Sequence, residues 1–309
     1  MADLQHIHEL VYDGDLVTKR YVADRPGACE REWRALNLLA EHAPGLAPEP
    51  VSREDGAITM TRIDGVPLRG LPRRAEHLAA MAEALVELHT AVPHQVLRTL
   101  PVRPWQREAV VDWLRLRCAQ WQPRNPAADR VVEEGLRWLD GWAAPGGGFG
   151  RDGVGGGLGR AEVGGLGRDG AGGLGRDEAG GFDRDGVGGF DCDGARESGI
   201  TPVFGAGDGN LANFLWDGER VRIVDFEDSG RSDLVYELAE LAEHVSMWVD
   251  GEVEIAGRFE LSPQEERRMR ECRKAQAFIW FFLLSHEGPR NPPGTFERQT
   301  ERVLAILGA

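Results

Sequence analysis

The 309-residue sequence predicts an α+β fold, in which strands occur in a few short stretches and helices make up most of the rest. In residues 8–21 apolar or alternating runs flank Asp13-Gly14, and in residues 214–224 two apolar runs flank Asp217-Gly218. An Asp-Gly pair between such runs is the strongest short-range signal for a β-hairpin. Elsewhere, apolar residues recur at helical spacing. A chain of this length can form one large domain or two smaller lobes.

The other elements follow from periodicity and from helix-breaking residues. Residues 30–42 predict a helix that ends near Pro44-Gly45, and residues 58–63 predict a strand that ends at Asp64-Gly65. We expect further helices at residues 75–90, 107–120, 128–142, 233–249, 263–286 and 293–307.

The expected helix at residues 233–249 is amphipathic, with an apolar face and an acidic face. Such a stripe of acidic residues is usually solvated surface, and contact with a cationic substrate is the alternative. Its members are Asp233, Glu237, Glu240 and Glu243.

Composition narrows the class of protein. With 41% hydrophobic and 28% charged residues the chain has the balance of a soluble globular protein. Its net charge of −15 argues against nucleic acid or an anionic membrane as partner and suits a cationic ligand better. The four cysteines show no C-x-x-C pairing, which indicates neither a disulfide framework nor a zinc site. The N-terminus lacks the pattern of a signal peptide, and we expect a cytoplasmic protein.

The strongest chemical signal lies in residues 203–232. Asp208 is followed five residues later by Asn213, and Asp225 comes at the end of the second strand of the hairpin. Transfer of a phosphoryl group to a hydroxyl needs a carboxylate that accepts the hydroxyl proton, and oxygen ligands that hold Mg²⁺ against the nucleotide phosphates. Asp208 is our candidate for the first role, and Asn213 and Asp225 are our candidates for the second. Asp and Asn are also common turn residues, but the hairpin brings these side chains back to one place.

This stretch resembles the aminoglycoside phosphotransferase family of small-molecule kinases, which are relatives of the protein kinases. The family pattern is roughly H-G-D-x-x-x-x-N, a hairpin, then I-D-F-E-D-A-G-R-G-D-x-x-Y-D-L-A. The chain has A-G-D-G-N-L-A-N and V-D-F-E-D-S-G-R-S-D-L-V-Y-E-L-A. The resemblance implies a two-lobed protein kinase-like fold, with a small, apparently truncated nucleotide-binding lobe at residues 1–64 and a mostly helical catalytic lobe at residues 65–309. Ala206 stands where the family usually has a His that is thought to brace the loop.

The resemblance also implies residues that bind the nucleotide. In kinases a strand Lys contacts the phosphates and is held by a helix Glu, which points to Lys19 and Glu32, with Glu30 as the alternative to Glu32. Taken alone, Lys19 would more often be a solvated residue of an edge strand. The strand at residues 58–63 would lead into the hinge between the lobes, where Thr61 and Ile63 are candidates for contact with the adenine. The chain shows no Gly-rich loop that would cover the phosphates.

The implied function is transfer of phosphate from ATP or GTP, with Mg²⁺, to a hydroxyl of a small molecule. An aminoglycoside-like acceptor, and with it a role in antibiotic resistance, is the favoured expectation, while choline-like or other metabolite hydroxyls remain open. The main alternative is a non-catalytic, kinase-like nucleotide-binding protein, which Ala206 and the missing loop suggest. Retention of Lys19 together with the three motif residues argues against it, because a scaffold does not need all four.

Residues 146–197 form a Gly-rich insert with repeated units such as G-G-L-G-R-D-G-A. These units resemble the calcium-binding nonapeptide of β-rolls, but most are one residue short, which would break the register of stacked turns. So few apolar residues cannot offset the entropy of ordering. We therefore expect a disordered insert, and an ordered calcium-binding repeat is the alternative.

Replacement of residues 146–195 by a short Gly-Ser linker should leave the thermal unfolding temperature and the activity nearly unchanged. The entropy of loop closure changes by only about 0.6 kcal/mol for each doubling of loop length. Scanning fluorimetry and a phosphate-transfer assay on both forms check this. If excision unfolds the protein or selectively removes acceptor binding, the repeat is ordered structure or a substrate lid.

Overall fold

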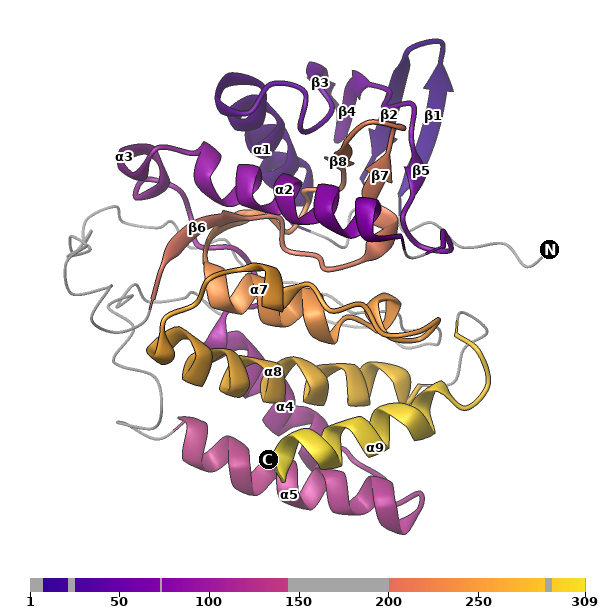
Figure 1. Cartoon of the computed structure of the whole chain (residues 1–309), viewed down its shortest axis with the longest axis vertical. Coiled ribbons are helices and arrows are strands. Elements are labelled where there is room, and N and C mark those ends of the chain that lie inside the picture. Colours follow the sequence, from indigo (N-terminus) through magenta and orange to yellow (C-terminus); the bar gives the residue numbers. More distant parts are fainter. Residues whose placement is uncertain (1–7, 22–25, 73, 144–199, 287–290, 309) are drawn as a thin grey trace, which may run out of the picture.

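The computed structural model describes residues 8–21, 26–72, 74–143, 200–286 and 291–308. The insert expected at residues 146–197 lies outside these ranges. Figure 1 shows a strand-rich end, which includes α1 (Ala28–His42), and a helical end, which includes α4 (Arg107–Ala119), α5 (Pro126–Ala143), α8 (Pro263–Leu284) and α9 (Thr295–Leu307). Helices α2 (Ala75–Ala91) and α7 (Leu234–Glu243) lie between these ends.

The N-terminal strands form an antiparallel sheet in the order β1-β2-β4-β3. Their bounds are Glu9–Asp13 for β1, Leu16–Arg20 for β2, Pro50–Glu54 for β3 and Ala57–Thr61 for β4. The predicted first hairpin is confirmed, but Asp13 pairs with Leu16, which moves the turn to Gly14 and Asp15. Gly14 has a φ of 57°, a left-handed conformation that glycine adopts without strain.

Helix α1, Ala28–His42, follows β2 and buries one apolar face. Two smaller sheets are formed by strands that come later in the sequence. One has the order β5-β7-β8, with bounds Val66–Pro67, Phe214–Trp216 and Val221–Ile223, and the other pairs β6, Pro202–Gly205, with β9, Gly230–Asp233. The predicted second hairpin is thereby confirmed as β7 and β8.

The remaining helices are α2 (Ala75–Ala91), α3 (His94–Leu97), α4 (Arg107–Ala119), α5 (Pro126–Ala143), α7 (Leu234–Glu243), α8 (Pro263–Leu284) and α9 (Thr295–Leu307). The expectation of a helix as far as residue 249 is wrong, because α7 ends at Glu243. His244 has φ −58° and ψ 135°, and its side chain accepts a hydrogen bond from the Ser246 N–H. This local side-chain bond begins a separate 3₁₀ turn, Val245–Met247, in place of the next helical turn.

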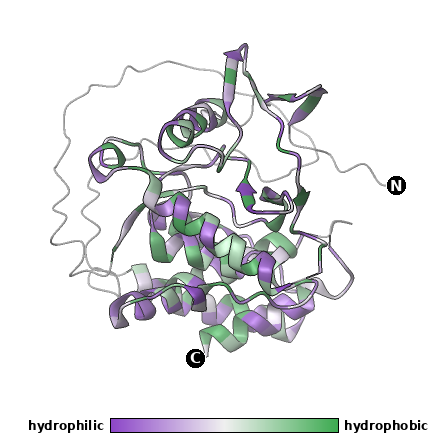
Figure 2. Cartoon of the chain, turned by 45° about the horizontal axis from the view of Figure 1, so that its top comes forward, coloured by the Kyte–Doolittle hydropathy of each residue, from purple (hydrophilic) through white to green (hydrophobic). Residues whose placement is uncertain are grey.

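Two hydrophobic clusters stabilise the fold. The first joins α1, β4, α2 and the β7–β8 hairpin, and the second joins α4, α5, α7, α8 and α9. In Figure 2 the helices carry both apolar (green) and polar (purple) residues, as expected of helices with one face in a core. Helices α5 and α8 pack so closely that a Cβ at Gly135 would lie 2.4 Å from Cζ of Phe278. Within the described residues, no helix combines the length and the apolar character that a membrane crossing requires.

The acidic stripe of α7 is not solvated surface, and this prediction is wrong. Arg103, whose side chain has no exposed area, donates to Glu237 and, at 2.5 Å, to Glu240. The other two members also have arginine partners: Glu243 pairs with Arg273 at 2.6 Å and Arg302 at 3.2 Å, and Asp233 pairs with Arg268.

Burial and pairing act in opposite directions on the two carboxyl groups beside Arg103. Burial alone would raise the pKa of each carboxyl group. At Glu237 the charge of Arg103 and the hydrogen bonds from Ser232 and Arg103 together outweigh burial and lower the pKa, whereas burial prevails at Glu240 and raises its pKa to about 7. The stripe therefore acts as a set of internal ion pairs that join α7 to its neighbours.

Arg103→Met should destabilise the protein by about 3–5 kcal/mol, because it leaves the buried Glu237 and Glu240 without their counter-charge. Arg115→Met is the matched control. Arg115 pairs with Asp140 at 3.3 Å with both side chains largely exposed, and the loss should be below about 1 kcal/mol. Urea unfolding of both variants measures the difference, and equal losses would contradict the structural role of Arg103.

Candidate active site

Lys19 lies on β2, between β1 and β4, and is buried. Its Nζ lies 2.6 Å from Glu32 Oε2, 3.2 Å from Glu227 Oε2, and in direct contact with Asp225. The structure thus pairs Lys19 with Glu32 and excludes the edge-strand alternative. Glu30, the fallback, is exposed and pairs with Arg53.

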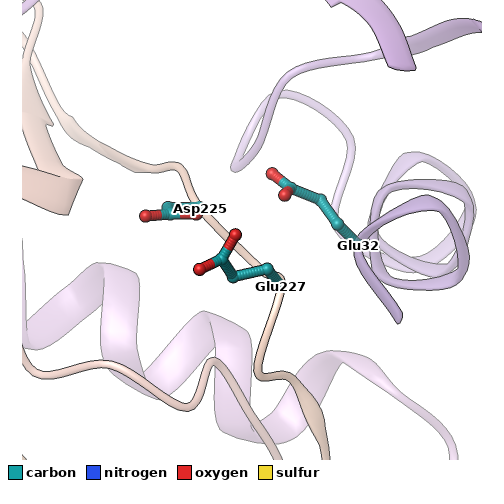
Figure 3. A group of neighbouring side chains, drawn as sticks. All are labelled: Glu32, Asp225 and Glu227. Atoms are coloured by element: carbon teal, nitrogen blue, oxygen red, sulfur yellow. The ribbon is translucent and has the colours of Figure 1, made fainter. Parts of the chain in front are cut away.

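Figure 3 shows Glu32, which comes from α1, facing Asp225 and Glu227, which come from one irregular segment after β8. One carboxylate oxygen from each lies within 4.8 Å of the others. Carboxylate oxygens are the ligands that Mg²⁺ prefers in proteins, so the donor set fits a divalent cation. Glu227 was not among the residues predicted from the sequence. The D-F-E pattern places this second carboxylate two residues after Asp225.

The electrostatics of this cluster favour a cation. Burial alone would lower the pKa of Lys19, but Glu32 and then Asp225 outweigh burial and raise it, so the side chain stays an ammonium. Tyr21 donates to Glu32 Oε2 at 2.5 Å, and burial together with Glu32 raises the pKa of its phenol. The Lys19 ammonium therefore faces three carboxylates, of which Glu227 also contacts His8, and additional positive charge would favour the approach of a nucleotide phosphate.

Asp208 and Asn213 lie in the loop between β6 and β7. Asp208 Oδ1 accepts the Asn210 N–H at 2.9 Å, and Asp208 Oδ2 accepts from Asn213 Nδ2 at 3.0 Å. The Asn213 carbonyl accepts the Val224 N–H at 3.0 Å, which ties this loop to the end of the hairpin, directly before Asp225. The predicted pair Asp208 and Asn213 is thus in direct contact.

The backbone of the loop that carries Asp208 lies close to the backbone of the segment that carries Asp225. Gly207 has a φ of 86°, and a Cβ there would lie 2.2 Å from the Asp228 carbonyl oxygen. Asp225 itself has a φ of 70°, a left-handed conformation that is uncommon for residues other than glycine. Such local strain is typical of positions where the backbone aims a side chain into a site.

The pKa of Asp208 is raised to about 6, first by burial and then by the charge of Asp225, against the hydrogen bond from Asn210. Its side chain nevertheless keeps 37% of its area exposed, so a ligand can reach it. A carboxylate whose pKa is close to neutral pH is a stronger proton acceptor than an ordinary one.

Thr61 and Ile63 lie apart from this cluster. With Asp64 they line a hollow of about 490 Å³ whose other walls include Gly45 and Arg222, and none of Lys19, Asp208, Asn213 and Asp225 lines it. The Thr61 N–H donates to the Glu49 carbonyl, so Ile63 is the stronger of the two hinge candidates.

The chain is similar to known proteins in one segment of its sequence and in its fold. Residues 200–272 match the family model described as the phosphotransferase enzyme family, which confirms the resemblance over the segment that carries the motif. No curated protein is significantly similar to the chain in sequence.

Solved structures show the fold. A choline/ethanolamine kinase family protein from Mesorhizobium loti has a TM-score of 0.58 at 18% identity, over 98% of this chain and 86% of that one. The choline kinase LicA from Streptococcus pneumoniae gives 0.53 at 13%, over 100% and 92%. An aminoglycoside phosphotransferase from Streptomyces rimosus, solved with ADP and streptomycin, gives 0.50 at 16%, over 88% and 92%. The expected two-lobed, kinase-like α+β fold is confirmed.

Asp225→Ala should weaken magnesium-dependent nucleotide binding more than Asn213→Ala, because a carboxylate offers the cation a full charge and an amide only a dipole. Glu30→Ala, on the same helix as Glu32 but outside the cluster, should behave as wild type. Titration of magnesium against a fluorescent nucleotide measures this order. Equal titrations for wild type and the first two variants would refute the assignment.

Proposed function

We propose that the protein transfers the γ-phosphoryl group of ATP or GTP to a hydroxyl of a small molecule, with Mg²⁺ as the cofactor. The observation that carries the proposal is the convergence of Lys19, Asp208, Asn213 and Asp225 from distant segments. Asp208 and Asn213 share a hydrogen bond, and Lys19 contacts Asp225.

Each residue of the site has its own role in this proposal. Lys19, held by Glu32, binds the phosphates. Asp225 and Asn213 would hold Mg²⁺, and Glu227, which has a carboxylate oxygen within 4.8 Å of one from Asp225, would offer an additional oxygen ligand. When bound, the cation neutralises phosphate charge that the three carboxylates would otherwise repel.

Asp208 accepts the proton of the acceptor hydroxyl. A bond forms between the hydroxyl oxygen and the γ-phosphorus, the bond from that phosphorus to the nucleoside diphosphate oxygen breaks, and the proton goes to a carboxylate oxygen of Asp208. Its raised pKa supports this role.

The acceptor class rests on the relatives and on charge. The similar structures include choline kinases and aminoglycoside phosphotransferases, among them a gentamicin complex and a streptomycin complex. Choline and aminoglycosides are both cations that carry hydroxyl groups, and the chain has a net charge of −15. We favour an aminoglycoside-like acceptor, and a choline-like alcohol is the second candidate. A panel of both classes, assayed for phosphate transfer from ATP and from GTP, identifies the substrate.

Asp208→Asn should lower kcat by roughly 10²–10⁴-fold while nucleotide affinity and thermal stability stay near wild type, because the amide has the same size and keeps one of the two acceptor oxygens but cannot accept the proton. Asp140→Asn makes the same chemical change at an exposed position and should leave kcat unchanged. Unaltered turnover in Asp208→Asn would remove Asp208 from the mechanism. A wild-type protein that binds nucleotide but phosphorylates no member of the panel would favour the non-catalytic alternative.

A further inference from the structure

His244 approaches Asp208 from the end of helix α7. It is the first residue after α7 and is 7% exposed. Its Nε2 lies 3.6 Å from Asp208 Oδ1, and the edge of its ring meets Trp280 at a centroid distance of 4.5 Å. This contact has no part in the residue roles derived above.

The hydrogen bonds of His244 determine where its proton lies. Nδ1 accepts the Ser246 N–H at 3.1 Å and lies 2.8 Å from Ser246 Oγ. Burial, assisted by the charge of Arg69, lowers the pKa of His244 to about 3, so the ring is neutral at neutral pH. Because Nδ1 acts as an acceptor, the single proton is on Nε2 and faces Asp208.

The same pair of residues ties the loop to α7. Ser246 Oγ accepts the Leu211 N–H at 2.9 Å, and Ser246 is 1% exposed. A Cβ at Gly209 would lie 2.7 Å from Cα of Leu241, so the loop packs directly on the α7 backbone. His244 is therefore held at a fixed place relative to Asp208.

Asp208 Oδ2 accepts a hydrogen bond from the Asn213 amide, and Oδ1 accepts one from the Asn210 N–H. Among the residues that the structure describes, no second donor lies at ordinary hydrogen-bond distance from Oδ1, so this oxygen can accept one more. Ala206 lies two residues away, and its methyl group cannot donate a hydrogen bond.

We propose that His244 is a positioning residue for Asp208: its Nε2–H holds Oδ1 while Asn213 holds Oδ2, and Ser246 fixes the tautomer that makes this contact. The inference rests on the proposed function of Asp208 as proton acceptor. A carboxylate held at both oxygens keeps one orientation, and small errors in the placement of a reacting group reduce rates strongly. The 3.6 Å separation shortens to a hydrogen bond in the complex with substrates.

The kinetic test compares two substitutions of one residue. His244→Leu removes the donor and should lower kcat by about 10–100-fold, the range found for residues that orient the ligands of a metal site. The KM for nucleotide should stay near wild type, because His244 is not one of the residues proposed to bind the nucleotide or its metal ion. His244→Gln keeps an N–H donor on a side chain of similar reach and should recover most of kcat.

His77→Leu is the matched control. His77 is equally buried, but its Nδ1 contacts the Pro72 carbonyl, and this variant should retain the kcat of wild type. The proposal is overturned if His244→Leu keeps full kcat, if the Leu and Gln variants lose the same activity, or if the loss appears in KM instead of kcat.

Nuclear magnetic resonance of the ring nitrogens tests the contact without any turnover. The ¹⁵N shifts of His244 should report the neutral Nε2–H tautomer, and Asp208→Asn should move the Nε2 resonance while His77 stays unchanged. An Nδ1–H tautomer, or an Nε2 resonance that does not respond, overturns the proposal even if every variant at His244 fails to fold. A wild-type protein that phosphorylates no acceptor would refute the proposed function. The ¹⁵N shifts of His244 would still show whether its Nε2–H contacts Asp208.

Discussion

The structure around the site depends on one buried ammonium among carboxylates. Lys19 contacts Glu32 from α1 and both Asp225 and Glu227 from the segment after the hairpin. These groups come from three separate parts of the chain, and none of the carboxylates could stay charged and close to the others without a cation between them. The ion cluster therefore fixes how α1, β2 and the end of β8 are placed, and the same placement directs Asp225 toward the loop of Asp208.

Features with a local cause could be predicted from the sequence. Both hairpins follow from Asp-Gly turns between apolar runs, and α1 and α2 follow from helical periodicity. The pairing of β6 with β9 was missed, because each has four residues and ends in or begins with glycine. The roles of Lys19 and Glu32 came from the resemblance, since the pattern around Lys19 alone favoured a surface strand.

Contacts between distant segments left no signal in the sequence. Periodicity identified the polar face of α7 but could not show that Arg103, Arg268 and Arg273 cover it. For the same reason Glu227 and His244 were not recognised as neighbours of Lys19 and Asp208. This pairing leaves the net charge of −15 unchanged, because the arginines are already counted in it, but the acidic groups of α7 no longer act as a local attraction for a cationic acceptor.

Helix α7 has no fully exposed residue along its whole length. Val235 and Leu238 belong to the second hydrophobic cluster, Leu241 belongs to the first, and the acidic residues between them pair with arginines. Most surface helices accept many substitutions on their outer side, but this one has no outer side. In a library of single substitutions, α7 should be among the least tolerant helices of the protein, and its sequence should change in evolution only together with the residues that surround it.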